Sequence, residues 1–135
     1  MEITRTNLDT LHPTAGYSHV TVVEAPRMAF LSGQVPLDST GSVVGVGDVE
    51  AQVDQVVANA MVTPEAVCAE PAHVVRSVVY VASDDTATLS AVWFRFTGSP
   101  LGAAFTTAST LLGVARLGYE GQLVELELTA ALPDR

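Results

Sequence analysis

Three hydroxyl side chains and one carboxylate near the end of the sequence are the residues best suited to chemistry on a small molecule. Thr107, Ser109 and Thr110 lie in an apolar run, and Glu125 follows in a strand-like alternation. A carboxylate held in a cleft can position a water molecule or take a proton from it, although the pattern fits a solvated edge residue equally well. Residues 97–114 contain no Arg, Lys or His, so a pocket built on this run receives no cation from it.

Residues 103–131 must position these side chains, and their pattern predicts a β-hairpin. Apolar and polar residues alternate over residues 122–129, as in a strand with one buried side. Gly118 and Gly121 precede that strand and provide the backbone freedom that a tight turn needs. We therefore expect the hydroxyl-bearing run and the Glu125 strand to pair with each other.

The remaining segments predict an α+β sheet with two helices on one face. Residues 1–16 are polar and predict a loop. Apolar residues at helical spacing predict one helix after an N-cap at Asp48 and a second after a cap in residues 83–85. Three strands are predicted: valine-rich runs at residues 18–23 and 73–81, the latter an interior strand covered on both faces, and the run MAFLS at residues 28–32. The order is strand–strand–helix–strand–helix–strand–strand.

Pro64 interrupts the first predicted helix, because proline lacks the N–H that a helix interior requires. Either the helix kinks there, or Thr63 caps a new helical turn with Pro64 in its first position. The second alternative is favoured, and Glu70 and Pro71 then end the helix.

The sequence carries no metal-ligand or cofactor motif. Gly45-Val46-Gly47 lacks the third glycine of a dinucleotide-binding loop and the long strand that should precede it. The three histidines have no metal-ligand spacing and no cysteine companions; they are His12, His19 and His73. We therefore predict no metal and no cofactor.

Arg76 and Cys68 have structural interpretations that are simpler than catalytic ones. Arg76 lies between valines in mid-strand, where a charge pair with Glu125 or Glu127 across the sheet is its simplest role. Cys68 lies in an alanine-rich segment, which favours a buried or inert thiol over a nucleophile.

Composition predicts one acidic domain over residues 1–135 that associates with copies of itself. Hydrophobic residues make up 48% and charged residues 16%, more apolar surface than one small domain can bury. The net charge is −9 and only six residues are Lys or Arg, which argues against nucleic acid as a partner. One cysteine, no signal-like N-terminus and no run of membrane length predict a soluble, cytoplasmic protein without a membrane partner.

Five segments resemble the RidA/YjgF family in order and spacing. They are GYSH at residues 16–19, SGQVPLD at 32–38, DVEAQVDQVVAN at 48–59, VVRSVVYV at 74–81 and GQLVELELTAA at 121–131. The resemblance implies a chorismate-mutase-like α+β fold with a mixed sheet and two helices on one face, assembled as a homotrimer with three clefts between subunits. The best-known members hydrolyse reactive enamine and imine intermediates, such as 2-aminoacrylate, to keto acids and ammonia.

The family pattern also implies roles for individual residues. Tyr17 matches the tyrosine that covers the cleft, Ser32 and Gly33 match the segment that lines it, and Glu125 matches the glutamate that orients the hydrolytic water. The family's carboxylate-binding arginine falls at Ser109 when the chain is anchored on residues 114–117, VARL. Since no arginine occurs on this run in any register, the loss does not depend on the alignment.

Three functions remain open from the sequence. The first is an enzyme, with Glu125 handling water or a proton, that acts on an enamine, imine or related intermediate without a free carboxylate; a hydrolase or another C–N-transforming biosynthetic enzyme fits, but a standard 2-aminoacrylate deaminase does not. The second is a trimer that holds a small molecule without turning it over. The third, nucleic-acid cleavage, has been attached to the family and is disfavoured by the charge of −9. Ser109 and Thr110 are the candidate ligand-binding hydroxyls of the cleft.

Overall fold

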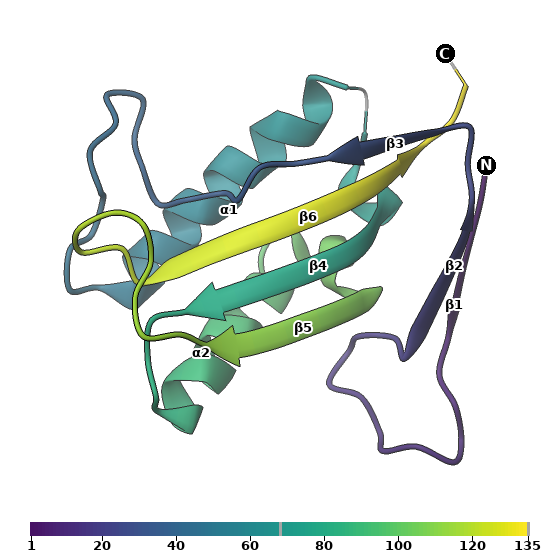
Figure 1. Cartoon of the computed structure of the whole chain (residues 1–135), viewed down its shortest axis with the longest axis horizontal. Helices are drawn as coiled ribbons and strands as arrows, with labels where there is room; N and C mark the ends of the chain where they lie inside the picture. Colours follow the sequence, from purple (N-terminus) through teal and green to yellow (C-terminus); the bar gives the residue numbers. More distant parts are fainter. Residues whose placement is uncertain (68, 135) are drawn as a thin grey trace.

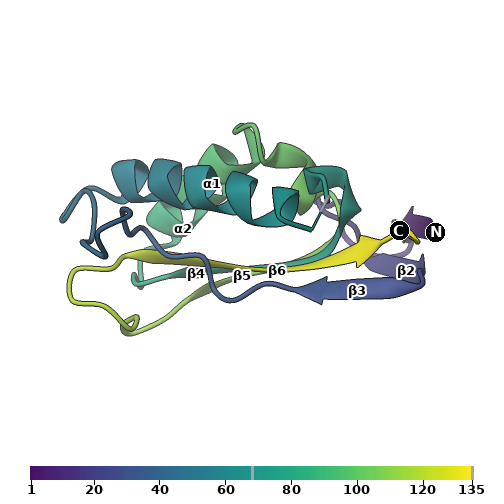
Figure 2. The ribbon, with the colours of Figure 1, turned by 90° about the horizontal axis from the view of Figure 1, so that it is seen from above.

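A computed structural model describes residues 1–67 and 69–134. Within these residues the chain forms a four-stranded sheet with two helices on one face and a separate two-stranded ribbon at one end (Figures 1 and 2). The elements in chain order are β1 Glu2–Thr6, β2 Val20–Glu24, β3 Arg27–Phe30, α1 Val49–Glu65, β4 Val74–Val81, α2 Thr86–Thr97, β5 Ala108–Gly113 and β6 Val124–Leu132, with short 3₁₀ turns at Pro71–His73 and Gly102–Phe105. The α+β class and the placement of both helices on one face are confirmed.

The four-stranded sheet has the order β3-β6-β4-β5 and is mixed, because β4 pairs antiparallel with β6 and parallel with β5. β5 and β6 therefore lie on either side of β4 and do not pair. The predicted hairpin is wrong for this reason. Alternation identified both strands, but it carries no information about which strand each one pairs with.

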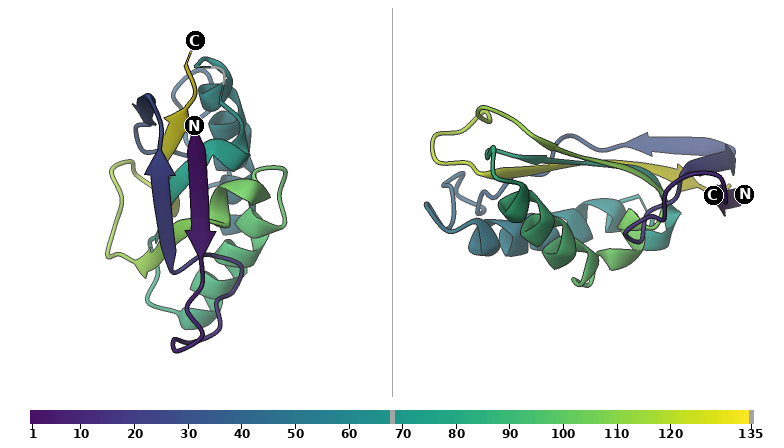
Figure 3. Two further views of the ribbon diagram at one scale, coloured as in Figure 1. Left: turned by 90° about the vertical axis from the view of Figure 1, so that its right-hand side faces the viewer. Right: turned by 90° about the horizontal axis from the view of Figure 1, so that it is seen from below.

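The first residues of the chain form a strand rather than the predicted loop. β1 pairs antiparallel with β2, from Glu2 opposite Glu24 to Thr6 opposite Val20, and the two form the ribbon seen face-on in Figure 3. The guanidinium of Arg5 donates to the backbone oxygens of Ala72 and Val74, at 2.8 and 2.9 Å, which ties the ribbon to the start of β4.

α1 is held to the sheet by its buried face and by one buried glutamine. Asp48 caps it as predicted, since its carboxylate accepts from the Ala51 N–H at 3.1 Å. Gln52 is fully buried; its side-chain amide donates to the Gly121 carbonyl at 2.9 Å and its oxygen accepts from the Leu123 N–H at 2.7 Å. α1 therefore fixes the turn from which β6, and with it Glu125, begins.

α1 continues through Thr63 to Glu65, so the favoured prediction of a new helical turn capped by Thr63 is wrong. The Thr63 hydroxyl instead donates to the Asn59 carbonyl at 3.0 Å, as a residue inside a helix does. The cysteine at position 68 lies outside the described residues.

α2 follows the predicted cap, because the Asp85 carboxylate accepts from the Ala87 N–H. The core lies between the helices and one face of the sheet. It contains apolar side chains from both helices, the Gly102–Phe105 turn and the inward positions of β4 and β6, including Val53, Val56, Trp93, Phe96, Leu101, Phe105, Val79, Leu126 and Leu128.

The other face of the four-stranded sheet is open in a single copy of the chain (Figure 2). β4 is an interior strand as predicted, but only its Ser77, Val79 and Val81 side is covered by helices. On the open side, Phe30 of β3 is 80% exposed and Met28 is 40% exposed. Large apolar side chains thus lie on a face that no element of the described residues covers.

Candidate functional site

A cavity of about 350 Å³ lies between α2, β5 and the loop before β2. It is lined by Ala15, Tyr17, Ser90, Trp93, Phe94, Ser109 and Leu111. Three of these residues are aromatic, three carry hydroxyls (one of them the phenol of Tyr17), and none carries a formal charge. Such a wall suits an uncharged, largely apolar molecule with a few hydrogen-bonding atoms.

Tyr17 is held in this wall from several sides. Its hydroxyl lies 2.7 Å from Nε2 of His12, and its ring meets Trp93 edge to face with centroids 6.1 Å apart. Two residues earlier in the chain, the backbone carbonyl of Ala15 accepts a hydrogen bond from the Trp93 indole N–H at 3.0 Å. The residue after Tyr17 is Ser18, whose hydroxyl donates to the Thr106 carbonyl at 2.7 Å, next to the start of β5. The tyrosine predicted to cover the cleft is therefore a fixed part of the cavity wall.

Ser109 lies in the cavity at the position where the family pattern has an arginine. Its hydroxyl is 2.6 Å from the Ser77 hydroxyl and 3.0 Å from the Thr107 carbonyl oxygen. Ser77 is fully buried on the helix side of β4, so Ser109 points to the same side. The side chain offers a short neutral hydroxyl to a ligand.

The other two candidate hydroxyls, Thr107 and Thr110, do not line this cavity in a single copy. Thr107 is fully buried and its hydroxyl is used internally, by Thr21 at 2.6 Å and the Val75 carbonyl at 2.8 Å. Thr110 follows Ser109 in the strand and so faces the opposite side, where its hydroxyl accepts from Arg76 at 2.7 Å.

Glu125 lies in a second place, against Gly33, the residue that follows Ser32. The Leu31 N–H donates to the Leu128 carbonyl and the Gln34 N–H to the Leu126 carbonyl. The segment 31–34 therefore has one residue more than the segment 126–128 of β6 that it pairs with. This extra residue is a bulge that brings the Gly33 backbone over Glu125. A Cβ on Gly33 would lie 2.8 Å from Cδ of Glu125, so only glycine leaves the carboxylate in place.

The Glu125 carboxylate is also held by its own turn. Gln122 is buried, and its side-chain amide donates to Oε1 of Glu125 and to the Val124 carbonyl, each at 3.0 Å. Its side-chain oxygen accepts from the Tyr119 N–H at 3.1 Å. The carboxylate remains half-buried with its second oxygen against Gly33, an arrangement that leaves room to contact a water molecule or a ligand.

Ser109 and Glu125 lie on opposite faces of the sheet. Ser109 pairs in register with Ser77, and Ser77 with Leu128, whose side chain is in the core. Glu125 is three residues from Leu128 and therefore on the other face. Of the predicted site residues, the structure brings together Tyr17 with Ser109, and separately Gly33 with Glu125, but the described residues do not join the two groups within one copy.

The face that bears Glu125 also carries Arg76, Tyr80 and Glu127. The Tyr80 hydroxyl donates to the Glu127 carboxylate at 3.3 Å. Burial and then the negative charge of Glu127 raise the pKa of Tyr80 above its usual range. Among residues 1–67 and 69–134, Arg76 forms no ion pair, and its predicted pairing with a strand carboxylate is replaced by the bond to Thr110.

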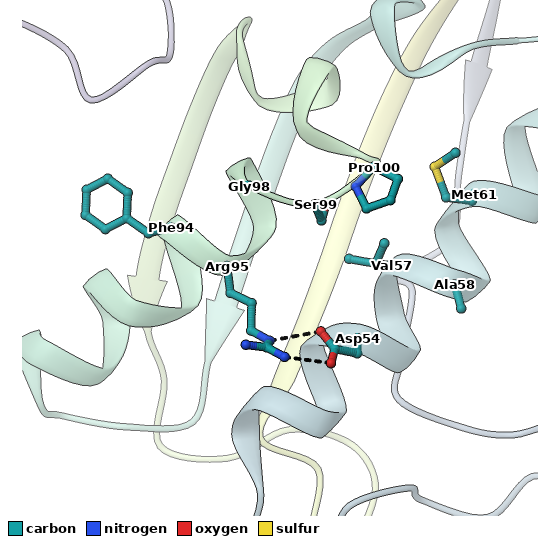
Figure 4. A pocket seen from close by; sticks show the side chains of 9 residues that line it. All are labelled: Asp54, Val57, Ala58, Met61, Phe94, Arg95, Gly98, Ser99 and Pro100. Atoms are coloured by element: carbon teal, nitrogen blue, oxygen red, sulfur yellow. Dashed lines mark hydrogen bonds and ion pairs between the residues drawn. The ribbon is translucent and has the colours of Figure 1, made fainter.

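A larger space of about 630 Å³ lies between α1 and α2 (Figure 4). Arg95 lies in its lining and donates to both carboxylate oxygens of Asp54, at 2.9 and 2.8 Å. None of the predicted site residues borders this space, and its one cation is already matched by a bidentate partner.

The comparisons with known proteins assign the family. The profile of the family described as endoribonuclease L-PSP matches residues 7–132. The chain belongs to this family, which is also called RidA/YjgF. It is 37% identical over 97 residues to the protein DfrA of Myxococcus xanthus, covering 70% of this chain and 74% of that protein.

Solved structures of the same family share the fold. The chain is similar to YyfB of Yersinia pestis, a protein of unknown function in the conserved Rid family, with a TM-score of 0.88 and 33% identity over 98% of this chain and 100% of that one. A putative endoribonuclease L-PSP of Entamoeba histolytica matches with a TM-score of 0.66 and 25% identity, over 97% of this chain and 100% of that one.

Two further observations concern metal ions and membranes. Within the described part of the chain, no three His, Cys, Asp or Glu side chains lie close enough to hold a metal ion. In the same residues, no helix is both long and apolar enough to cross a bilayer.

The histidine beside Tyr17 is the site feature that sequence reasoning missed. The spacing of His12 in the sequence bears only on metal binding, and residues 1–16 show no periodicity that predicts where a side chain in them will lie. The GYSH segment was the available signal, since it places a tyrosine of the cleft a few residues after His12.

Proposed function

We propose that this RidA/YjgF protein acts on an enamine, imine or related intermediate that lacks a free carboxylate, in clefts shared between copies of a homotrimer. Glu125 assists hydrolysis or proton transfer, and Tyr17, Ser32, Gly33, Ser109 and Thr110 are the proposed ligand-contacting residues. The alternative is a trimer that binds such a molecule without turning it over. No cofactor enters the proposal.

The uncharged cavity wall at Ser109 is the observation that supports a substrate without a free carboxylate. A free α-imino acid brings a carboxylate that loses its hydration in the cavity, and burying it without a partner costs several kcal/mol. The described cavity lining supplies hydroxyls and aromatic rings but no cation. A neutral Schiff base, ester or amide avoids this penalty, and its apolar substituents suit Tyr17, Trp93 and Leu111.

The opposite placement of Ser109 and Glu125 supports a site built from two copies. A carboxylate on one face of a sheet cannot reach a ligand held on the other face. The open face with its exposed Phe30 and Met28 offers a surface for another copy, and the family is generally trimeric. In such an assembly, Thr110 and Glu125 of one copy can border the Tyr17 and Ser109 cavity of the next.

The proposed reaction needs one carboxylate and one water molecule. Glu125 accepts a proton as the water oxygen attacks the C=N carbon, and the nitrogen takes up a proton. The C–N bond of the resulting carbinolamine then breaks, and the products are a carbonyl compound and an amine. General-base assistance of this kind typically contributes about 10²–10⁴-fold in rate.

Hydrolysis of a neutral Schiff base tests the proposal. N-benzylidenemethylamine is followed by the ultraviolet absorbance of benzaldehyde, with the wild type, Glu125→Gln and Glu127→Gln. We expect wild-type catalysis that falls by about 10²-fold or more in Glu125→Gln and is kept in Glu127→Gln, which changes an exposed carboxylate on the same face. Binding without any wild-type turnover would favour the alternative of a non-catalytic trimer.

A further inference from the structure

His12 and Tyr17 form a pair that the proposed reaction has not yet used. Their contact, 2.7 Å between Nε2 of His12 and the tyrosine hydroxyl, is as short as a well-formed hydrogen bond. Tyr17 lines the cavity, whereas His12 is exposed and does not. The pair therefore connects the cavity wall to solvent through one hydrogen bond.

Tyr17 carries the most acidic group in the described cavity lining, because a phenol gives up a proton far more readily than the alcohol of a serine. The other lining residues are alanine, serine, leucine, tryptophan and phenylalanine side chains. Glu125, the carboxylate of the proposed reaction, lies on the opposite face of the sheet. A proton delivered to a ligand atom from this side of the cleft must therefore come from the Tyr17 hydroxyl or from solvent.

The loop around the pair is built to hold His12 in place. The Asn7 side-chain oxygen accepts from the His19 N–H at 3.0 Å, and the Leu8 N–H donates to Nδ1 of His19 at 3.0 Å. The His19 ring then meets His12 edge to face with centroids 4.9 Å apart. Since Nδ1 of His19 accepts, neutral His19 carries its proton on Nε2, and that atom is buried without a hydrogen-bond partner in the described structure.

His12 decides whether Tyr17 offers a donor or an acceptor to a ligand. When Nε2 of His12 carries a proton, it donates to the phenol oxygen and leaves the phenol O–H free to donate into the cavity. When Nε2 is bare, it accepts the phenol proton, and the ligand meets only an oxygen lone pair. A Schiff-base nitrogen or a carbonyl oxygen is an acceptor, so the proposed substrates require the first arrangement.

We infer that His12 is a positioning residue that makes Tyr17 the proton donor of the cavity; this rests on the proposed function for the choice of an acceptor ligand. As water adds to the C=N carbon, the Tyr17 O–H bond breaks and an N–H bond forms on the substrate. The Nε2–H bond of His12 breaks to restore the tyrosine while the exposed ring takes up a proton from solvent at Nδ1, and Glu125 returns to solvent the proton that it took from the attacking water. The ligand class that follows is a neutral molecule with one acceptor atom directed at Tyr17.

A pair of nearly isosteric ligands tests this without requiring turnover. Acetophenone carries a carbonyl oxygen where α-methylstyrene carries a CH₂ group, so the ratio of their dissociation constants reports on the donor alone. One neutral hydrogen bond corresponds to roughly 2- to 12-fold in that ratio. We expect the wild-type protein, titrated by NMR, to prefer acetophenone by a factor in this range.

Three variants distinguish a role of His12 in positioning the Tyr17 hydroxyl from a role in packing the loop. Tyr17→Phe and His12→Leu should each bring the ratio close to one, and His12→Gln, whose amide can donate to the phenol oxygen, should restore part of the preference. If His12→Leu weakens both ligands equally and keeps their ratio, His12 only secures the loop and the inference is wrong. A wild-type ratio of one, a preference for α-methylstyrene or no binding of either ligand would also overturn it.

The outcome is separable from that of the Schiff-base assay. A preserved preference with no hydrolysis of N-benzylidenemethylamine removes the proposed reaction but keeps the role of His12. Hydrolysis that depends on Glu125 but is unchanged in kcat and in the ligand ratio by His12→Leu keeps the reaction and removes the role of His12.

Discussion

The backbone of Gly33 lies directly against the carboxylate of Glu125, and a Cβ at position 33 would overlap its Oε2 and lie 2.8 Å from its Cδ. No positive φ is recorded at Gly33, unlike Gly121 at φ 80°, so this glycine is required by close approach and not by backbone conformation. The contact joins two segments that are far apart in the sequence, SGQ at residues 32–34 and the start of β6. It sets the Gly33 backbone against one carboxylate oxygen of the proposed base, while the Gln122 amide donates a hydrogen bond to the other.

Gly33→Ala should therefore displace the Glu125 carboxylate. We expect only a small loss in the free energy of unfolding, because the overlapping atoms are the far end of the flexible Glu125 side chain, which moves at the expense of its hydrogen bond from Gln122, but a loss of Schiff-base hydrolysis similar to that of Glu125→Gln. The unfolding energy is measured by urea denaturation. In the Glu125→Ala background the methyl group has space, so the same substitution should cost less. Equal costs in the two backgrounds would show that the contact does not constrain the carboxylate.

Local patterns in the sequence predicted the helices and most strands, but not their long-range contacts. The helical face of α1, from Val53 to Ala60, and the caps at Asp48 and Asp85 depend on neighbouring residues and were correct. Strand pairing is not local, and so the alternation around Glu125 did not reveal that β4 separates β5 from β6. The placement of His12 beside Tyr17 depends on a loop without periodicity and could be seen only in the structure.

Replacing Phe30 should disrupt self-association. Phe30 is 80% exposed on the open face, so Phe30→Asp places a charge where the proposed trimer buries apolar surface. We expect light scattering to give a trimer for the wild type at micromolar concentration and smaller species for the variant. Val62→Asp is the matched control, since Val62 is 64% exposed on the helix layer. A wild-type monomer, or equal dissociation by both variants, would contradict this placement of the interface.

The Asp54–Arg95 pair should stabilise the protein only above the acid range. The hydrogen bond from Arg95 is the main cause that holds the pKa of Asp54 below its ordinary value of 3.8. The contribution is therefore complete above the unfolded-state pKa and is lost as pH falls through the lower folded-state pKa. Asp54→Asn should lower the urea midpoint slightly at pH 7, because the Asp54 side chain is 59% exposed and screened by water. This difference should disappear well below pH 3.8. Glu50→Gln, which removes a single contact of 3.5 Å to the same guanidinium, should have a smaller effect.

RNA should not bind at physiological salt, despite the ribonuclease named in the family description. Phosphate binding requires clustered cations that release counterions, and this chain has six Lys and Arg residues against fifteen Asp and Glu. Fluorescence anisotropy with a labelled single-stranded RNA should show no saturable binding. A complex that weakens steeply as the salt concentration rises would contradict the prediction.

Ser109→Arg should give the protein activity on free α-imino acids, which the wild type should hydrolyse poorly. A charge-assisted hydrogen bond is worth about 1.5–3 kcal/mol, and a bidentate guanidinium would pair the substrate carboxylate in a cavity that otherwise lacks a cation. We expect a gain of on the order of tenfold to a hundredfold in 2-aminoacrylate hydrolysis, and more if the new contact also orients the substrate. The imino acid is generated in situ and its decay is compared with the uncatalysed rate.

Val62→Arg is the control for Ser109→Arg, because it adds the same charge at a position that is 64% exposed on the helix layer, away from the proposed cleft. It should give no gain if the guanidinium must lie in the Tyr17 cavity. The activity of Ser109→Arg should be lost when Glu125→Ala is added, since the guanidinium binds substrate but does not activate water. Arg76→Ala tests whether the natural arginine of the open face already serves a neighbouring copy. Rapid wild-type hydrolysis that survives Arg76→Ala would show that the uncharged wall at Ser109 does not exclude a carboxylate substrate.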